Sequence, residues 1–339
     1  MNETTARVTA VHKERYELLA DGETLYGKLK TSVYLNGDEP FPTVGDDVAV
    51  QLNPAGDSVI LKTLPRKSYF ARMDPNPRIQ REQAVAANFD TVFILQSLNQ
   101  NFNVRRLERT LTLAWQSGGV PVIVLTKADL TPDPYPFVRD AESVAMGVDV
   151  AVVSAKTGFG LETLSKYMQP DSVSVFLGSS GVGKSSLLNA LAGETVMDVR
   201  EIREDDARGR HTTTHRQMIR LPNGAYIIDT PGMREMGIQS FGTPEADDQK
   251  ELRGALSEVF ADVEGLTCRF SDCKHQNEPG CAVRAAIESG SLTQERWDSY
   301  IKLKREARYA EDKAAAIREK SARNQAIAMW SRNRKKEIW

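Results

Sequence analysis

Residues 178–185 read Gly-Ser-Ser-Gly-Val-Gly-Lys-Ser, and this spacing of glycine, lysine and serine suits the binding of phosphate groups. The apolar run Val173–Gly178 predicts a strand before the loop, and Lys184–Leu191 predicts a helix after it. In that setting the glycines let backbone N–H groups face phosphate oxygens, and the helix directs its positive end at the anion. A glycine turn without a ligand does not account for both flanking elements. We therefore predict a nucleoside triphosphate site, in which Lys184 neutralises the phosphates and the Ser185 hydroxyl binds Mg²⁺.

Two further segments carry residues that suit the same site. Asp229-Thr230-Pro231-Gly232 ends an expected apolar strand, where Asp229 can hold Mg²⁺ through water and Gly232 can offer an N–H to the γ-phosphate. Between the two lies Arg-Gly-Arg-His-Thr-Thr-Thr at 208–214, in which either Thr213 or Thr214 can complete the Mg²⁺ shell. The predicted residues of the phosphate loop itself are Gly178, Ser179, Ser180, Gly181, Val182, Gly183, Lys184, Ser185 and Ser186.

A second pair of motifs, Thr126-Lys127-Ala128-Asp129 and Ser154-Ala155-Lys156, follows two other expected strands. These motifs resemble the guanine-specificity elements of translation-factor-type GTPases. The resemblance implies that the Asp129 carboxylate accepts from the N1–H and 2-amino groups of guanine, which adenine lacks. It also implies that Lys127 lies along the base and that the backbone of residues 154–156 meets the guanine O6. The family has Asn where this chain has Thr126, so a hydroxyl replaces an amide while Asp129 keeps the selectivity. The predicted base-binding residues are Thr126, Lys127, Ala128, Asp129, Ser154, Ala155 and Lys156.

The order of these motifs along the chain is unusual. Ordinary GTPases have the phosphate loop first and the base motif later, whereas here the base motifs precede residue 178. The same sheet can form if the chain is cut and rejoined elsewhere, because the neighbours of each strand are unchanged. The domain therefore resembles a circularly permuted P-loop GTPase.

Hydrolysis needs a group that orients the attacking water. Ras-like enzymes have a glutamine directly after the Asp-x-x-Gly motif, but this chain has the apolar Met233. His211 is the candidate instead, because a neutral imidazole accepts a hydrogen bond from water near neutral pH. The alternative is an ordinary exposed histidine in a loop. We predict His211, Lys184 and Thr213 as the catalytic group, with Ser185, Thr213 and Asp229 on Mg²⁺.

All three cysteines and one of the four histidines lie in the segment Cys268-x4-Cys273-x-His275-x5-Cys281. Three thiolates and one imidazole make a closed tetrahedral set for structural zinc and leave no open position for catalysis. A disulfide framework would leave one cysteine over, and three unrelated thiols would not be expected to cluster so closely. We predict one structural Zn²⁺ on these four residues.

The elements that must position these residues fall into three parts. Over residues 6–62, short β-rich segments separated by turns predict a small barrel, either an OB-fold or an SH3-like barrel. Residues 64–80 hold three prolines and predict an irregular connector. From residue 88, apolar strands alternate with helices, as in a doubly wound α/β sheet, and from residue 244 the chain is helical. The expected barrel strands are Arg7–Val11, Tyr16–Ala20, Thr24–Lys30, Val48–Leu52 and Ser58–Lys62, and the expected α/β helices before the phosphate loop are Val104–Trp115, Phe137–Met146 and Leu161–Met168.

Composition and charge limit the class of protein. The chain has 339 residues, of which 40% are hydrophobic and 27% charged, as in globular proteins of two or three domains. The polar N-terminus and the lack of an 18-residue apolar run predict a cytoplasmic protein without a membrane partner. The net charge is −2, but residues 301–339 carry twelve Lys or Arg and five Asp or Glu. This basic tail, with Trp330 and Trp339, suits RNA contact, and the alternative is a solvated charged helix.

Taken together, the barrel, the permuted domain and the Cys3His cluster resemble the RsgA/YjeQ family of small-ribosomal-subunit biogenesis GTPases over nearly the whole chain. The resemblance implies GTP hydrolysis to GDP and phosphate, stimulated by the small ribosomal subunit in a late step of its maturation. It also implies that the barrel and zinc domain contact ribosomal RNA. The expected parts are a barrel (1–65), a linker (66–87), the permuted GTPase domain (88–243) and a zinc-binding helical domain with the basic tail (244–339). We expect a monomer that uses GTP or GDP, Mg²⁺ and one Zn²⁺.

Three other functions remain open from the sequence. A permuted GTPase of large-subunit assembly is disfavoured by the barrel and the Cys3His domain. A P-loop ATPase is disfavoured by Asp129. A GTP-sensing RNA-binding module with little catalysis is kept open by Met233.

Overall fold

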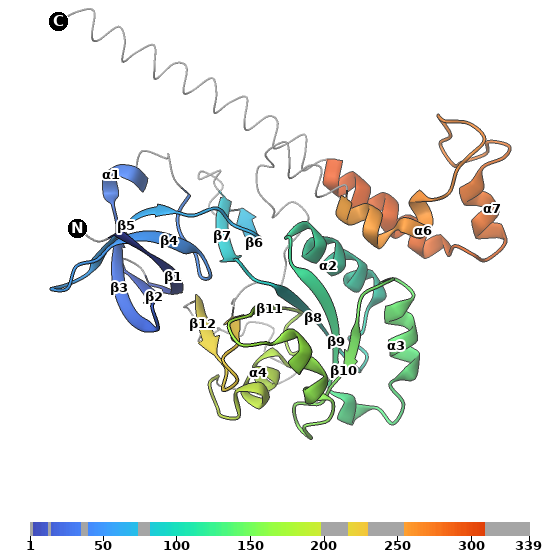
Figure 1. Ribbon diagram of the computed structural model, residues 1–339. Coiled ribbons are helices and arrows are strands. Elements are labelled where there is room, and N and C mark those ends of the chain that lie inside the picture. Colours follow the sequence, from blue (N-terminus) through green and yellow to red (C-terminus); the bar gives the residue numbers. More distant parts are fainter. Residues whose placement is uncertain are drawn as a thin grey trace, which may run out of the picture. The chain divides into compact units, whose positions relative to one another are not determined.

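A computed structural model describes residues 3–12, 15–34, 40–73, 82–197, 216–229 and 254–308 (Figure 1). The chain divides into two compact units. Met1–Ala71 and Gln83–Met236 form the first unit, and Arg72–Glu82 and Gly237–Trp339 form the second. The first unit holds a barrel and an α/β domain, and the second holds the Cys/His cluster.

Five strands at the start of the first unit close into a barrel. Their order is β1-β2-β3-β5-β4, and β4 returns to pair with β1. Because β3 and β5 are parallel, the chain must cross over between them, and it does so through α1 and β4. This topology is an OB-fold, which decides between the two barrels left open by the sequence. The elements are β1 (Glu3–Val11), β2 (Tyr16–Ala20), β3 (Glu23–Leu29), α1 (Thr31–Tyr34), β4 (Asp47–Gln51) and β5 (Ser58–Thr63).

Alternation of buried and outward side chains builds the barrel core. In β2, for example, Tyr16, Leu18 and Ala20 are buried while the residues between them are half-exposed. Strand β1 begins at Glu3, four residues before the predicted start at Arg7. The additional residues are mostly polar, and they form a strand because they pair with β4 across the closure of the barrel.

The α/β domain is built on six strands in the order β10-β9-β8-β11-β13-β12. The first five are parallel neighbours, and β12 joins β13 in antiparallel pairing. The chain first builds outward from β8 to β10 and then returns to place β11 on the other side of β8. The doubly wound sheet is therefore confirmed, and its topological switch point lies between β8 and β11. The strands are β8 (Thr91–Ser97), β9 (Val120–Thr126), β10 (Val150–Val152), β11 (Val173–Leu177), β12 (Arg216–Arg220) and β13 (Tyr226–Asp229).

Short helical elements connect the parallel strands. The Asn103 side chain caps α2 by accepting a hydrogen bond from the Arg106 N–H, and the buried face of α2 includes Leu107 and Leu111. The predicted helix Leu161–Met168 is instead a 3₁₀ helix, η2, which Gly160 precedes with a positive φ of 72°. The helical elements are α2 (Val104–Gln116), η1 (Ala128–Leu130), α3 (Tyr135–Glu142), η2 (Leu161–Tyr167) and α4 (Lys184–Ala192).

The predicted irregular connector contains regular structure, so this prediction was wrong in part. Strands β6 (Tyr69–Met73) and β7 (Glu82–Ala87) form a two-stranded sheet. The two strands avoid the prolines, because Pro75 and Pro77 fall between them at residues outside the described ranges.

The barrel and the α/β domain meet at two places. Ala10 and Val11 of β1 pair with Gln217 and Arg216 of β12, so one sheet of eleven strands runs through both parts. At the second place Gly45 has a φ of +91°, and a Cβ there would lie 2.0 Å from the Ala87 carbonyl oxygen. Only glycine fits so close an approach with this backbone conformation.

A buried ion pair supports the second contact. The Asp46 carboxylate is 0% exposed and accepts hydrogen bonds from Nε and Nη2 of Arg66, each at 2.7 Å. The same carboxylate accepts from the backbone N–H of Thr43 at 2.7 Å. These bonds offset the cost of burying the charge and fix the loop that carries Gly45.

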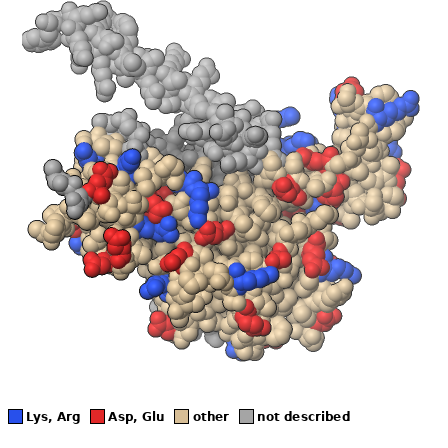
Figure 2. All heavy atoms as spheres, in the orientation of Figure 1, with Lys and Arg blue, Asp and Glu red and all other residues tan. Residues whose placement is uncertain are grey.

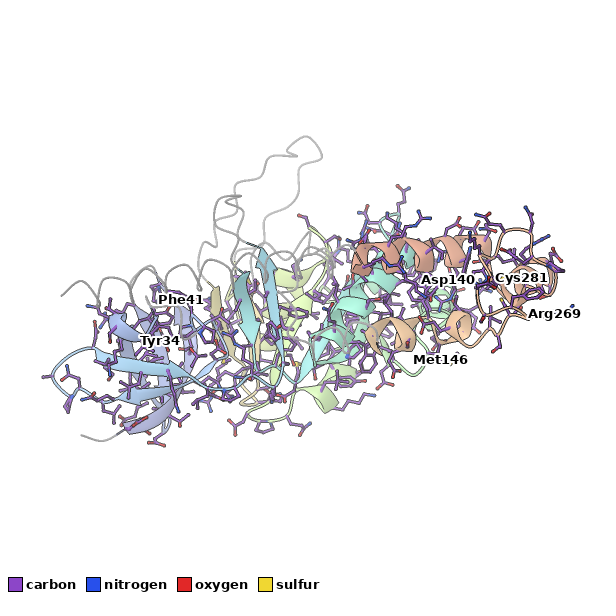
Figure 3. All side chains as sticks on the ribbon, turned by 90° about the horizontal axis from the view of Figure 1, so that it is seen from above. Tyr34, Phe41, Asp140, Met146, Arg269 and Cys281 are labelled. Carbon is purple, nitrogen blue, oxygen red and sulfur yellow. The ribbon has the colours of Figure 1, made fainter. Side chains whose placement is uncertain are left out.

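The second unit is helical in its described part. Helical turns occupy residues 254–259 and 294–308, together with α6 (Ala261–Glu264) and α7 (Ala282–Glu288). Figure 3 labels Arg269 and Cys281, which lie close together where the Arg269 N–H donates to the Gly280 carbonyl at 3.1 Å. Among the helices of the described ranges, none is long and apolar enough to cross a membrane.

Candidate functional site

The predicted nucleotide-binding residues gather at the carboxyl ends of β9, β11 and β13 and directly after β10. In doubly wound sheets, ligands bind in the crevice at this edge near the topological switch point. The Leu98 N–H, just after β8, donates to the Thr126 carbonyl at the end of β9 at 2.9 Å. Strand order thus brings the base motifs and the phosphate loop together, although they are about 50 residues apart in the chain.

The phosphate loop joins β11 to α4 in the conformation its glycines allow. Gly181 and Gly183 have φ values of 70° and 106°, which other residues rarely adopt. Lys184 begins α4, and its Nζ donates to the carbonyls of Gly178 at 2.6 Å and Ser179 at 3.0 Å. Its ammonium group is therefore held over the loop, where a phosphate group would be bound. The remaining loop residues, Ser180, Val182, Ser185 and Ser186, lie between these positions or in the first turn of α4.

A pocket of about 210 Å³ lies beside this loop and contains most of the predicted base-binding residues. The Ser154 hydroxyl donates to Oδ1 of Asp129 at 2.6 Å, which fixes the carboxylate at the pocket. The Ala128 N–H donates to the Val153 carbonyl at 3.1 Å and ties the two motifs together. The predicted residues that line the pocket are Thr126, Lys127, Asp129, Ala155, Lys156, Gly183 and Ser186.

Thr126 occupies a different place from the one the guanine motif implies. It is 4% exposed, and its hydroxyl donates to the Val182 carbonyl in the phosphate loop at 2.6 Å. The Gln96 carbonyl lies 3.3 Å from the same hydroxyl. Thr126 contributes to the pocket wall, but its hydroxyl group donates its hydrogen bond to the protein backbone.

Three apolar residues of the pocket were not anticipated from the sequence. Leu130 directly follows the base motif, Val153 directly precedes Ser154, and Leu187 is the fourth residue of α4. Their positions next to Asp129, Ser154 and Ser186 were the only available signal, because apolar side chains carry no motif of their own. They give the pocket a surface suited to a flat aromatic base.

Asp229 ends β13, which is the neighbour of β11. Burial raises the pKa of the Asp229 carboxyl, and the positive charge of Lys184 acts in the opposite direction. A divalent cation would favour the ionised form of Asp229 and thus offset the effect of burial.

Several predicted site residues lie outside the described ranges. These are His211, Thr213, Thr214 and Gly232, together with Met233. Their roles stay predictions, and their only structural context here comes from the described residues on either side of them.

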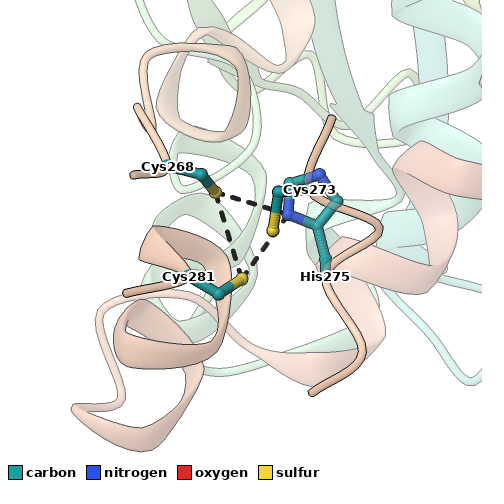
Figure 4. A group of neighbouring side chains, drawn as sticks. All are labelled: Cys268, Cys273, His275 and Cys281. Atoms are coloured by element: carbon teal, nitrogen blue, oxygen red, sulfur yellow. Dashed lines mark hydrogen bonds between the residues drawn. The ribbon is translucent and has the colours of Figure 1, made fainter. Parts of the chain in front are cut away.

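The Cys/His cluster forms a compact group in the second unit (Figure 4). The ligand atoms of Cys268, Cys273, His275 and Cys281 all lie within 4.8 Å of one another. The sulfur atoms of Cys268 and Cys281 are 4.0 Å apart, and each lies 3.5 Å from Nδ1 of His275. Ligand atoms of a tetrahedral zinc site lie about 3.6–3.8 Å apart, and this group of three thiols and one imidazole is compatible with such a site.

Two contacts join this cluster to the helices around it. Cys281 precedes α7, and its sulfur accepts from the Arg284 N–H at 3.5 Å. The ring of Trp297 meets the His275 ring edge-on, with centroids 5.0 Å apart. The cluster therefore connects a loop, α7 and the helix over residues 294–308.

Comparison with known proteins agrees with this architecture. The family model described as RsgA GTPase matches residues 63–239. The small ribosomal subunit biogenesis GTPase RsgA 2 of Listeria monocytogenes is 46% identical over 306 residues, which are 89% of this chain and 83% of that protein. A protein named small ribosomal subunit biogenesis GTPase RsgA from Methanosarcina acetivorans is 40% identical over 91% of this chain and 80% of its own length.

Solved structures show the same fold. The YjeQ crystal structure from Thermotoga maritima has a TM-score of 0.64 and 28% identity, and the match covers 89% of this chain and 97% of that one. YloQ, described as a circularly permuted GTPase, has a TM-score of 0.60 and 24% identity over 92% of this chain and 96% of its own. The strand order and the position of the phosphate loop in this chain agree with that description. The chain belongs to the RsgA GTPase family.

Proposed function

We propose that this protein hydrolyses GTP during the biogenesis of the small ribosomal subunit and that the subunit stimulates the reaction. GTP hydrolysis itself follows from membership of the family. The observation that carries the proposal is the single site in which a phosphate loop adjoins a base pocket containing Asp129. The names of the curated relatives support the small subunit over the large one.

Guanine recognition is assigned to the pocket between β9, β10 and α4. The Asp129 carboxylate is held by Ser154 and accepts from guanine N1–H and the 2-amino group. Adenine offers neither donor, so the Asp129 carboxylate would make no hydrogen bond to that base, which disfavours ATP. Lys127 has a left-handed backbone with a φ of 61°, and its side chain passes 4.0 Å from the position of a Cβ at Gly183. That position suits a stem that lies between the base and the phosphate loop.

Phosphate binding is assigned to the backbone N–H groups of residues 178–186 and to Lys184. When bound, Mg²⁺ would neutralise charge on the β- and γ-phosphate oxygens, and Ser185, Asp229 and Thr213 are the residues that would hold it. A water molecule then attacks the γ-phosphorus, and the bond to the bridging oxygen of GDP breaks. His211 is proposed to accept a hydrogen bond from that water, the role that Met233 cannot fill.

The partner is proposed to be ribosomal RNA of the small subunit. The OB-fold barrel is a common oligonucleotide-binding fold, and the Cys3His group is proposed to hold one structural Zn²⁺ in the second unit. Figure 2 shows acidic and basic side chains interspersed over the described residues of one face, without a large patch of either sign. Recognition of RNA by the barrel is proposed to use local groups, such as the Arg15 guanidinium stacked 3.9 Å from the Tyr26 ring centroid.

Steady-state GTP hydrolysis tests the proposal when it is measured with the protein alone, with small subunits and with large subunits. We expect kcat to rise by about tenfold or more with small subunits and not with large subunits. Docking on RNA would complete a site that has Met233 in place of the glutamine of Ras-like enzymes. ATP should neither be hydrolysed nor compete with GTP. Equal stimulation by both subunits, or none, would contradict the partner assignment while leaving the nucleotide site in place.

A pair of histidine variants tests the catalytic role within the same assay. His211→Ala should lower the stimulated kcat by about 100-fold or more, as expected for loss of a group that orients the nucleophile, with GTP affinity retained. His215→Ala is the matched control, four positions away, and should retain the stimulated rate. If both variants behave alike, the assignment of His211 fails.

A further inference from the structure

The loop that carries the proposed zinc ligand His275 also contains a carboxylate, that of Glu278, which is not among the predicted ligands. Its Oε1 accepts a hydrogen bond from the Lys274 N–H at 3.0 Å. Its Oε2 accepts from the N–H groups of Gln276 at 2.9 Å and Asn277 at 3.0 Å. One carboxylate thus holds backbone groups on both sides of His275.

The Glu278 carboxylate is ionised, and both of its oxygens face the backbone. Its own N–H, together with those of Lys274, Gln276 and Asn277, lowers the pKa of the Glu278 carboxyl. Hydrogen bonds from N–H groups to a charged carboxylate are roughly twice as strong as bonds between neutral groups. The group of ligand atoms that lie within 4.8 Å of one another contains no oxygen of Glu278. Glu278 is therefore a support for the loop rather than a further ligand.

The backbone of His275 needs such a support. Its φ is 60°, a left-handed conformation that is uncommon for a residue with a side chain, so neighbouring contacts must hold it. In this conformation Nδ1 of the ring lies 3.5 Å from the sulfur atoms of both Cys268 and Cys281 (Figure 4). The N–H groups bonded to Glu278 include those directly before and directly after His275. The carboxylate thus fixes the peptide groups that set the direction of the imidazole.

Glu278 also begins the turn that leads to Cys281. Pro279 and Gly280 follow it, and Gly280 has a φ of 76°, which is the pattern of a type II turn. The Gly280 carbonyl accepts from the Arg269 N–H at 3.1 Å, which joins this turn to the segment that carries the first predicted ligand. One residue therefore connects the backbone that presents the imidazole with the backbone that presents Cys281.

We propose that Glu278 is a positioning residue for the zinc site, and that its hydrogen bonds to the loop hold His275 and Cys281 in the geometry that the metal requires. The inference rests on the proposed binding of one structural Zn²⁺ by the Cys3His group. Groups that orient metal ligands from behind contribute strongly to affinity, and their loss commonly weakens metal binding by about 10–100-fold. At this site the carboxylate orients the ligands through their backbone.

Charge and hydrogen bonding at Glu278 act on zinc binding in opposite directions. Zn²⁺ with three thiolates and one neutral imidazole is a complex of net negative charge, which a nearby carboxylate repels. If charge alone mattered, a neutral residue in place of Glu278 would strengthen zinc binding. Loss of the hydrogen bonds to the loop would weaken it. The sign of the change therefore identifies its cause.

Glu278→Gln tests the proposal in the full-length chain, because glutamine keeps the shape of the side chain but replaces one acceptor oxygen with an amino group. We expect the affinity for Zn²⁺, measured by competition with a chromophoric chelator, to fall about tenfold. Co²⁺ in place of Zn²⁺ gives a second readout. Its visible ligand-field bands should shift from those of the parent protein because the imidazole changes direction, an effect that a loss of stability alone would not produce.

Asp272→Asn is the matched control. The exposed Asp272 lies directly before the ligand Cys273, so its replacement removes the same charge while the bonds from residues 274–277 to Glu278 remain. This variant should bind Zn²⁺ as tightly as the parent chain or more tightly. If Glu278→Gln binds as the parent does, or if both variants weaken alike, the inference is overturned. If the parent chain itself binds no zinc, the proposed zinc site fails instead.

Hydrogen exchange of the unmodified protein, resolved to single residues, keeps the inference testable if Glu278→Gln fails to fold. In the zinc-loaded protein, the amides of Lys274, Gln276 and Asn277 should exchange about tenfold or more slowly, relative to their intrinsic rates, than the amide of Asp272 in the same loop. If the three amides exchange as fast as that of Asp272, the Glu278 carboxylate does not hold them and the inference is overturned.

Discussion

The hydroxyl group of Thr126 joins the base-binding and phosphate-binding parts of the nucleotide site. It donates to the Val182 carbonyl and lies at the position where related GTPase motifs have an amide. Because Thr126 is buried, water cannot replace this donor easily. In this chain the Thr126 hydroxyl therefore links the base motif to the phosphate loop.

Thr126→Val removes the hydroxyl and keeps the shape of the side chain. We expect the affinities for GDP and GTP to fall together by about tenfold, because a buried carbonyl of the phosphate loop loses its donor. Preference for GTP over ATP should persist, since Asp129 is untouched. Equilibrium titration with fluorescent nucleotides measures both effects.

Thr126→Ser is the control for that titration, because it retains the hydroxyl and should bind nearly as well as the parent chain. Loss of guanine preference in Thr126→Val would show that the hydroxyl reads the base, contrary to the geometry described here.

At this scale the sequence predicted where the polar residues gather but not what each one touches. Asp129 and Ser154 could be placed together because both follow parallel strands, whose carboxyl ends meet at one edge. The direction of the Thr126 hydroxyl could not be predicted. It depends on how closely β9 approaches Val182, a residue 56 positions away in the chain.

At the scale of elements, the Cys/His cluster takes the place of a larger apolar core. Its residues lie in turns and irregular segments between α6 and α7, with few buried apolar side chains among them. Its contacts reach α7 through Cys281 and the helix over residues 294–308 through Trp297. A metal that holds four side chains together would thus order both helices.

Removal of zinc tests this dependence. Purified protein should contain about one zinc per chain, and a zinc-selective chelator with Mg²⁺ in excess should unfold the region around α7. Trp297 fluorescence should shift to longer wavelength as its ring leaves His275, and the shift should be absent in Trp297→Phe. GDP binding should be retained, because the base pocket and phosphate loop belong to the first unit. A parallel loss of GDP affinity would contradict this independence.

The strands that were not predicted from the sequence include β12, which pairs with a strand far away in the chain. Strand β12 is five residues long, Arg-Gln-Met-Ile-Arg, and lacks a strong apolar pattern. It forms because β13 and β1 cover its two edges. The continuously apolar strands β8, β9 and β11 were predicted well, since burial on both faces leaves a clear signature.

At the scale of the whole molecule, the barrel and the α/β domain belong to one compact unit. They share a continuous sheet and a glycine contact, and the ion pair of Asp46 and Arg66 fixes the loop that carries this glycine. Separating the two parts would expose the buried Asp46 carboxylate to solvent and would leave the outer edge of β12 unpaired.

Denaturant unfolding followed by hydrogen exchange tests this view. Peptides from β2 and β3 of the barrel and from β8 and β9 of the α/β domain should lose protection at the same denaturant concentration, as expected for one cooperative unit. Peptides from α7 report the second unit and serve as the comparison. If the barrel peptides lose protection at a clearly different denaturant concentration from the β8 and β9 peptides, the two parts do not unfold as one unit.

The pairing of β1 with β12 also imposes an order on synthesis. Ala10 and its partner Gln217 are more than two hundred positions apart in the chain. At translation rates of about 5–20 residues per second, β1 is synthesised roughly 10–40 s before β12. During that interval the end of β1 presents open backbone groups to every neighbouring chain. The nascent chain therefore has an unpaired strand edge from the synthesis of β1 until the synthesis of β12.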